Sequence, residues 1–209
     1  MANILYVTCN VKSQARARTL LLGDEFMDEY LRKNPQDEVQ VLDLYRDSIQ
    51  RVDQDVLSAW GRIERGEEYG FLSDEERRKI NKIWRIADQF RRCDKYVFVT
   101  HSLNLWFPAE FKMYIDAICV LDRTYRLTPE GTEGMLHGLS RKSLHLHANQ
   151  PYKFGGEGDQ SVAYLRSVLC FLGVADQETV LLQGDDPERG RWDEYEAVRG
   201  KLLELARRF

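Results

Sequence analysis

The sequence predicts an α/β protein in which five parallel strands form one sheet with helices on both faces. Two observations lead to this prediction. Short apolar runs of strand length recur five times along the 209 residues, and a longer segment with helical periodicity follows each of them. Strands that alternate with helices form parallel sheets, because each helix carries the chain back across a face of the sheet.

The five strands are predicted from apolar runs that polar or turn residues bound on either side. They are ILYVT (4–8), VQVLDL (39–44), YVFVT (96–100), SLHLHA (143–148) and TVLLQG (179–184). Nearly continuous apolar runs are typical of strands that are buried on both faces. Since crossovers are right-handed, five such strands favour a doubly wound sheet with the flavodoxin-like order 2-1-3-4-5.

Helices are predicted where apolar residues recur every three or four positions. The clearest case is residues 74–92, in which Ile80, Ile83 and Ala87 share one face. Gly173 is a stop signal for a later helix. The predicted helices cover residues 17–34, 74–92, 108–120, 160–173 and 191–209.

No repeat, low-complexity tract or long linker divides the chain, so residues 1–209 are expected to form a single domain. Two connections are unusually long. Residues 51–73 read as a polar, irregular excursion, and residues 121–141 contain three glycines. Long connections in a compact α/β domain are usually functional or form interfaces.

The composition limits the classes of partner. Hydrophobic residues make up 43% of the chain and charged residues 31%, which is ordinary for a globular protein. A net charge of −4 gives no general attraction to nucleic acids or anionic membranes. The N-terminus lacks a signal-peptide pattern, and no stretch approaches the roughly 20 apolar residues of a membrane span. The four cysteines lie far apart, which favours a reduced, cytoplasmic protein. From the charge and the missing membrane span we expect neither nucleic-acid nor membrane partners.

Ligands of such sheets bind beyond the carboxyl ends of the strands, where the strand order reverses. That point is expected beside residues 9–19, 101–107 and 148–158. The first of these loops enters a helix, whose N-terminal N–H groups favour an anion such as phosphate. The loop has neither G-x-G-x-x-G nor G-x-x-x-x-G-K-[ST], so a Rossmann site and a P-loop are not supported. Its basic residues could equally form a solvated turn.

The second loop places Leu103, Leu105 and Trp106 around a single Asn104. These apolar side chains could border a flat heterocycle with Asn104 at its edge, or they could cover the core or a dimer interface. In the strand before the third loop, His145 and His147 share one face, but tetrahedral metal sites need three or four ligands. We therefore expect these histidines to be core or hydrogen-bonded residues, and no metal.

Cys9 ends the first strand, in the position of a phosphatase nucleophile. The C-x5-R pattern is absent, because Ala15 stands six residues after Cys9. We therefore expect Cys9 to be a small buried apolar residue. No Ser-His-Asp or Cys-His set can be assembled from the sequence either. The chain thus offers no catalytic residue of its own.

Six segments spread over the chain match one known pattern. They are ILYVTCN, NPQDEVQVLDLY, LNLWFPAEFKMYIDAICV, TYRLTPEGTEGMLHGL, KSLHLHA and YLRSVLCFLGV. With these segments the chain resembles, over essentially its full length, the FMN-dependent NADH-azoreductase family of flavodoxin-like quinone and azo-dye reductases. The most specific pieces are FPAEFKMYID with its preceding Asn and YLRSVLCFLGV.

The resemblance implies flavin contacts at defined positions. The family residue after the first strand, which contacts the phosphate, corresponds to Asn10, and the Ser-x-Ser of the first helix falls on Ala17, Arg18 and Thr19. The loop that lines the isoalloxazine falls on His101, Ser102, Leu103, Asn104 and Leu105. The glycine-rich loop after the fourth strand falls on Ala148, Asn149, Gln150 and Pro151.

Some of these positions depart from the family pattern. Ala17 replaces a serine, His101 a proline and Leu103 an aromatic residue, while Gln150-Pro151 replaces two glycines. Pro151 removes a backbone donor and the conformational freedom of glycine. At the phosphate, Arg16 or Arg18 could compensate through charge-assisted hydrogen bonds.

The resemblance implies a homodimer that binds FMN. Hydride from NADH or NADPH would reach the flavin, and a quinone or azo compound would then take two electrons in a ping-pong sequence. Residues 51–73 and 121–141 would shape the substrate side. Two alternatives stay open: a binding or regulatory module of the same fold that has lost FMN, and a hydrolase such as a phosphodiesterase.

Overall fold

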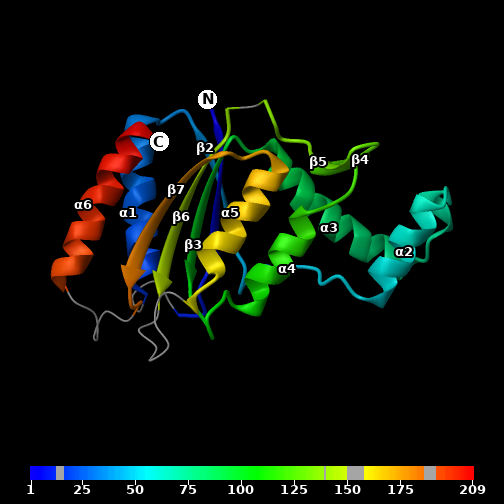
Figure 1. Cartoon of the computed structure of the whole chain (residues 1–209), viewed down its shortest axis with the longest axis horizontal. Helices are drawn as coiled ribbons and strands as arrows, with labels where there is room; N and C mark the ends of the chain where they lie inside the picture. Colours follow the sequence, from blue (N-terminus) through cyan, green and yellow to red (C-terminus); the bar gives the residue numbers. More distant parts are fainter. Residues whose placement is uncertain (13–16, 139, 150–157, 186–191) are drawn as a thin grey trace.

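The computed structural model describes residues 1–12, 17–138, 140–149, 158–185 and 192–209. A parallel sheet of five strands in the order β2-β1-β3-β6-β7 forms its centre (Figure 1). This order equals the predicted 2-1-3-4-5 once the two strands of a separate hairpin are set aside, so the predicted fold class is confirmed. The strands are β1 (Asn3–Cys9), β2 (Glu38–Asp43), β3 (Lys95–His101), β6 (Lys142–Asn149) and β7 (Asp176–Gln183).

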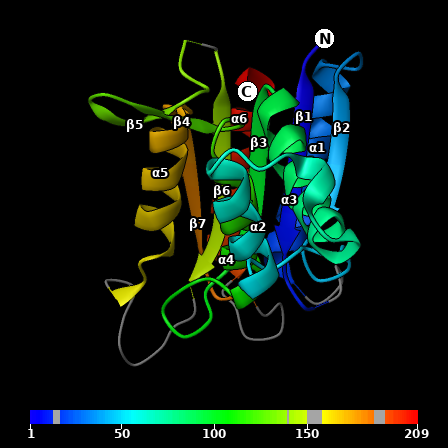
Figure 2. The ribbon, with the colours of Figure 1, turned by 90° about the vertical axis from the view of Figure 1, so that its right-hand side faces the viewer.

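Helices cover both faces of the sheet (Figures 1 and 2). Side chains alternate along each strand, so Ile4 and Tyr6 of β1 pack towards α1 and α6, whereas Leu5 and Val7 pack towards α4 and α5. The helices around the sheet are α1 (Arg18–Lys33), α3 (Asp74–Arg92), α4 (Ala109–Ile118), α5 (Ser161–Leu172) and α6 (Trp192–Arg208). Two apolar cores, one on each face, therefore hold the sheet rigid.

The excursion between β2 and α3 is more regular than the sequence predicted. It contains α2 (Gln54–Glu64) and a 3₁₀ turn (Tyr69–Phe71). Helix α2 buries only Val56 and Ala59, which pack in a small separate core with apolar residues of α3. The expectation of an irregular segment was wrong here, because two small buried residues leave a weak apolar period.

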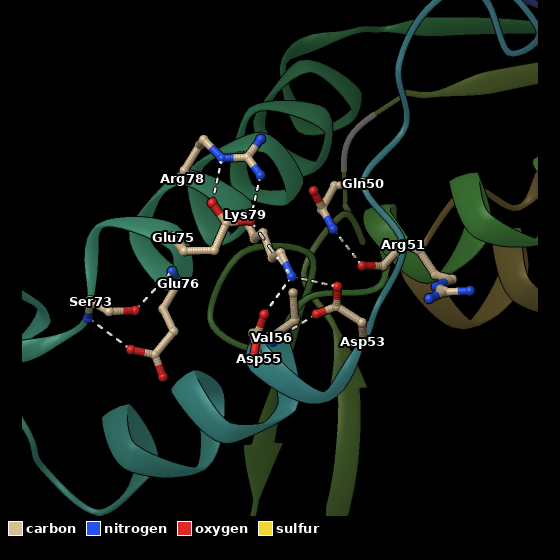
Figure 3. A network of polar contacts seen from close by, with 10 residues as sticks. All are labelled: Gln50, Arg51, Asp53, Asp55, Val56, Ser73, Glu75, Glu76, Arg78 and Lys79. Atoms are coloured by element: carbon tan, nitrogen blue, oxygen red, sulfur yellow. Dashed lines mark hydrogen bonds and ion pairs between the residues drawn. The ribbon is translucent and has the colours of Figure 1, made fainter.

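Charged side chains join α2 to α3 (Figure 3). The ammonium of Lys79 in α3 donates to Asp53 at 2.7 Å and to Asp55 at 2.5 Å, both at the start of α2. Ser73 and Glu76 form a capping box at the N-terminus of α3, in which each side chain bonds the backbone N–H of the other residue. These contacts fix the direction in which the excursion leaves the domain.

The long connection after α4 forms an antiparallel hairpin of β4 (Tyr125–Thr128) and β5 (Gly131–Gly134). The hairpin lies against the end of α5, where the backbone N–H of Leu136 donates to the carbonyl of Leu172 at 2.9 Å. The approach is so close that a Cβ on Gly134 would collide with the backbone of Phe171. Sequence reasoning did not foresee this hairpin.

Strand β7 begins at Asp176, three residues before the predicted start. It is one of the two edge strands of the five-stranded sheet, and its pairing with β6 already begins at Asp176. An edge strand accepts the polar run Asp-Gln-Glu, because one side of it faces solvent.

Candidate functional site

The carboxyl ends of β1, β3, β6 and β7 lie at one end of the sheet, where the arrowheads point in Figure 1. We call this end of the sheet the C-terminal edge. The order reverses between β1 and β3, because β2 lies outside β1 and the chain continues on the other side of it. The N-terminus of α1 opens at this edge, and so does that of α5. This is the predicted place for a ligand.

Three side chains meet at the N-terminus of α1. Asn10 follows β1, Thr19 lies in the first turn of α1, and Asp185 follows β7. The Asp185 carboxylate accepts hydrogen bonds from the Thr19 N–H at 2.9 Å, the Thr19 hydroxyl at 2.7 Å and the Asn10 side-chain amide at 2.6 Å. The group is closed to solvent, and Asp185 is only 2% exposed. We call these donors of Asn10 and Thr19 the anion cradle.

Sequence reasoning assigned Asn10 and Thr19 to one site, and the structure brings them together; it did not foresee Asp185. Ala17 is the N-cap of α1 and provides no side-chain hydrogen bond. The backbone N–H of Arg18 donates to the Asp185 carbonyl at 3.1 Å, and the buried guanidinium lies 5.0 Å from the ring centre of Tyr195 in α6. Arg18 therefore links the N-terminus of α1 to Asp185 and to α6. Arg16, the other predicted partner, lies outside the described residues.

His101, the last residue of β3, ties the neighbouring strand ends together. Its Nδ1 lies 3.1 Å from the carbonyl of Cys9, to which it donates. Burial lowers the pKa of His101, and the negative charge of Asp185 opposes this only in part. Ser102 continues the connection, since its N–H donates to the Ala148 carbonyl at 2.8 Å. Two of the predicted loops are thus joined by their backbones.

Leu103 to Trp106 form a tight turn closed by two backbone hydrogen bonds between its end residues, at 2.6 Å and 3.2 Å. The two central residues have positive φ angles, 53° for Asn104 and 66° for Leu105. Asn accepts this conformation readily, but a leucine there is strained. Strained backbone of this kind gathers at ligand sites. The turn leaves Leu103 43% and Trp106 39% exposed, at the end of the sheet where the strands have their carboxyl termini.

The turn is anchored to the start of α5. The Leu105 carbonyl accepts from the N–H of Gln160 at 3.2 Å, and the Leu105 side chain lies against Gly158. The Trp106 ring packs edge-on against Tyr164, with centroids 5.2 Å apart. The Leu103–Trp106 turn is therefore held against α5 through both Leu105 and Trp106.

The end of β6 and the start of α5 each carry an unsatisfied polar atom. Among the described residues, neither Oδ1 of Asn149 nor Oγ of Ser161 has a hydrogen-bond partner, although both atoms are buried. Buried polar atoms without partners are uncommon and often belong to ligand sites. The remaining predicted contacts, Gln150 and Pro151, lie outside the described residues.

A chain of hydrogen bonds runs beneath the site. The Thr100 hydroxyl lies 2.8 Å from Nε2 of His145 and 2.7 Å from Nδ1 of His147, and Nε2 of His147 lies 3.0 Å from Asp159. Burial and the neighbouring His147 lower the pKa of His145 well below its ordinary value. Both histidines are thus hydrogen-bonded core residues, as the sequence predicted; Thr100 and Asp159 as their partners were not foreseen.

Cys9 is fully buried, and this burial raises its pKa above the ordinary value for a thiol. A thiolate is the reactive form of cysteine, so the Cys9 position does not suit a nucleophile. The expectation that Cys9 is a buried apolar residue agrees with this geometry.

The residues present fit a flavin mononucleotide in their chemistry. The anion cradle offers donors of the kind that a phosphate needs. The turn at Asn104 offers apolar side chains beside an amide, and Asn149 offers an unused acceptor. One feature of the fit is unusual, because a carboxylate of the chain already occupies the donors of the cradle.

Comparison with known proteins shows the family to which the chain is similar. Residues 2–204 match the family model described as "Flavodoxin-like fold". The FMN-dependent NADH:quinone oxidoreductase of Geotalea uraniireducens is 50% identical over 209 residues, which cover 99% of this chain and 97% of the relative. The protein of the same description from Trichlorobacter lovleyi is 47% identical and covers 93% of each chain.

Solved structures agree. The azoreductase from Bacillus anthracis strain Sterne superposes with a TM-score of 0.87 at 27% identity, over 100% of both chains. An FMN-dependent NADH-azoreductase from Bacillus anthracis strain Ames Ancestor, in complex with FMN, gives 0.83 at 25% identity, over 99% of this chain and 100% of the other. Within the described part of the chain, no helix is long and apolar enough to cross a membrane.

The resemblance that the sequence motifs indicated is thereby confirmed: the chain belongs to the flavodoxin-like fold family and, within it, to the family of FMN-dependent NADH:quinone oxidoreductases.

Proposed function

We propose that the protein is an FMN-dependent NADH:quinone oxidoreductase that also reduces aromatic azo compounds. The observation that carries this proposal is the pairing, at one sheet edge, of the anion cradle with the apolar turn at Leu103–Trp106. The 50% identity to a relative described by this activity supports it. When bound, FMN supplies the redox chemistry, since it accepts a hydride and passes two electrons to the acceptor.

The residues of the chain bind and orient in this proposal. Asn10 and Thr19 would hold the phosphate, which is negatively charged and suits the N-terminus of α1. The strained turn would place the amide of Asn104 at the edge of the ring system and the side chains of Leu103 and Leu105 along its border. Asn149, whose Oδ1 lacks a partner among the described residues, would accept a hydrogen bond from the flavin.

We further propose that the chain acts as a homodimer of single-domain subunits in the cytoplasm. Exposed apolar side chains gather on the two long connections, with Leu57 at 56% and Phe71 at 71% on one and Leu127 at 67% on the other. Such residues favour an interface between subunits. All four cysteines are free thiols, which suits a reducing compartment. Light scattering of the purified protein tests the dimer, and a monomer mass would exclude it.

The two half-reactions test the activity. Protein loaded with FMN is mixed anaerobically with NADH, and the oxidised-flavin absorbance near 450 nm should bleach. Addition of a benzoquinone should restore it, and addition of an azo dye should restore it while the dye loses colour. Bleaching no faster than that of free FMN would contradict the proposal, as would reduced protein that no quinone reoxidises.

One alternative keeps support. A protein of this fold that has lost FMN would act in binding or regulation only, and the carboxylate in the anion cradle favours this reading. Protein that gains no flavin at a large excess of FMN would establish it. The hydrolase alternative has lost its basis at Cys9, which is buried and has a raised pKa.

A further inference from the structure

Asp185 occupies the place that an anionic ligand would take. Its two carboxylate oxygens accept hydrogen bonds from the backbone and side chain of Thr19 and from the side chain of Asn10, at 2.6 to 2.9 Å. These are the donors that the proposed function assigns to the phosphate of FMN. All three donors of the anion cradle are therefore hydrogen-bonded to Asp185.

The position of Asp185 also explains how α1 begins. Ala17 cannot cap the helix through its side chain, and its place is filled by an acceptor 166 residues away in the chain, which bonds the Thr19 N–H. Carboxylates stabilise helix N-termini through hydrogen bonding and through the helix dipole. A cap alone, however, does not require a charge, since asparagine caps as well as aspartate does.

A buried carboxylate at this point has a consequence for phosphate. Like charges a few ångströms apart repel, and the repulsion is larger away from bulk water. A phosphate that uses the anion cradle must push the Asp185 carboxylate aside or share the donors with it. A neutral hydroxyl meets no such repulsion, because it can donate a hydrogen bond to the carboxylate.

We propose that Asp185 reduces the preference of the site for FMN over riboflavin: it weakens the binding of the phosphate of FMN and accepts the terminal hydroxyl of riboflavin. This inference rests on the proposed function, because it assumes that a flavin binds at this edge. The site then binds FMN and riboflavin with much closer affinities than the same cradle without the acid. Asp185 is thus a specificity-determining residue rather than a catalytic one.

The test measures dissociation constants of FMN and of riboflavin by quenching of flavin fluorescence. Asp185→Asn keeps an acceptor for the Thr19 N–H and removes the charge. We expect this variant to bind FMN at least tenfold more tightly than the wild type, about 1.4 kcal/mol, and riboflavin within about twofold. The ratio of the two affinities is the decisive quantity.

A matched control removes a different charge at the same sheet edge. Asp43 ends β2, and its carboxylate accepts from the N–H of Tyr45 at 3.0 Å, a contact that asparagine retains. Asp43→Asn should leave the affinity ratio within about twofold of the wild type. Asp185→Ser serves as a second variant if Asp185→Asn does not fold, because serine also caps helices.

The possible outcomes separate the two proposals. A change in the FMN-to-riboflavin ratio of less than about twofold in Asp185→Asn, or a weaker binding of FMN, overturns the role of Asp185 while a flavin site remains. An equal gain in Asp43→Asn also overturns it, because the effect would then be one of net charge. If neither flavin binds to the wild type or to any variant, the proposed function fails, and the selectivity proposal fails with it.

Discussion

The chain of hydrogen bonds beneath the site predicts a large loss of stability when Thr100 becomes valine. Asp159 is ionised, because hydrogen bonds from His147 and Ser161 outweigh the opposing effect of burial and lower its pKa. An ionised carboxylate only accepts, so Nε2 of His147 carries a proton and donates to Asp159. The Thr100 hydroxyl lies within hydrogen-bond distance of Nδ1 of His147 and of Nε2 of His145, and a hydroxyl can donate to one ring nitrogen while it accepts from the other.

Thr100→Val keeps the shape of the side chain and removes the hydroxyl, which is completely buried. Two ring nitrogens, one of His145 and one of His147, then lose their partner in a place that water does not reach. An unsatisfied buried polar group costs about 1–3 kcal/mol. We therefore expect the free energy of unfolding to fall by about 2–6 kcal/mol.

Thr100→Ser is the matched control, because it keeps the hydroxyl and removes one methyl group, at a cost of about 1 kcal/mol. Urea unfolding at pH 7, followed by circular dichroism, gives both values, and the slope against urea should stay unchanged. A Thr100→Val variant as stable as Thr100→Ser, within about 0.5 kcal/mol, would show that the two histidines do not depend on the Thr100 hydroxyl.

Three further predictions address other parts of the fold. Gly23→Ala should cost about 1–3 kcal/mol in urea unfolding, because its Cβ would collide with the hydroxyl of Tyr6 and with Val99; an unchanged midpoint would contradict the close approach of α1 to the sheet. Lys79→Met should speed cleavage by subtilisin within residues 51–73, since it removes the contacts with the start of α2; equal cleavage rates would count against this anchoring role. The lowered pKa of Asp159 lies below the value of about 3.9 for an unfolded chain. Its contribution to stability is therefore complete above pH about 4 and is lost as the pH falls through the folded pKa, so the melting temperature should drop more steeply with acid in the wild type than in Asp159→Asn; parallel curves would contradict this.

The parts of the fold that the sequence predicts well are those with a strong period. The run YVFVT and the helix over 74–92 have uniform apolar patterns, and both elements appear where expected. The hairpin of β4 and β5 has no such pattern, because each strand has only four residues and Gly134 is the only buried one among them. Its position depends on the close contact with α5, and periodicity carries no information about that contact.

The candidate site likewise contains residues that the sequence predicts and residues that it does not. Asn10 and Thr19 could be found, since both lie at the end of the first strand and the start of the following helix, where phosphates bind. Asp185 could not, because GDDPER reads as the start of the last helix and nothing local shows that its acid reaches another helix. The strain at Leu105 was also hidden, since leucine rarely marks a turn with positive φ.

The most direct test of the account is the visible absorption spectrum of the purified protein, incubated with FMN and then passed through a desalting column. We expect a retained oxidised-flavin band near 450 nm, and Thr19→Val, which removes a donor of the anion cradle, should retain less. A colourless wild-type protein after incubation at a hundredfold excess of FMN would contradict the claim that this sheet edge is a flavin site.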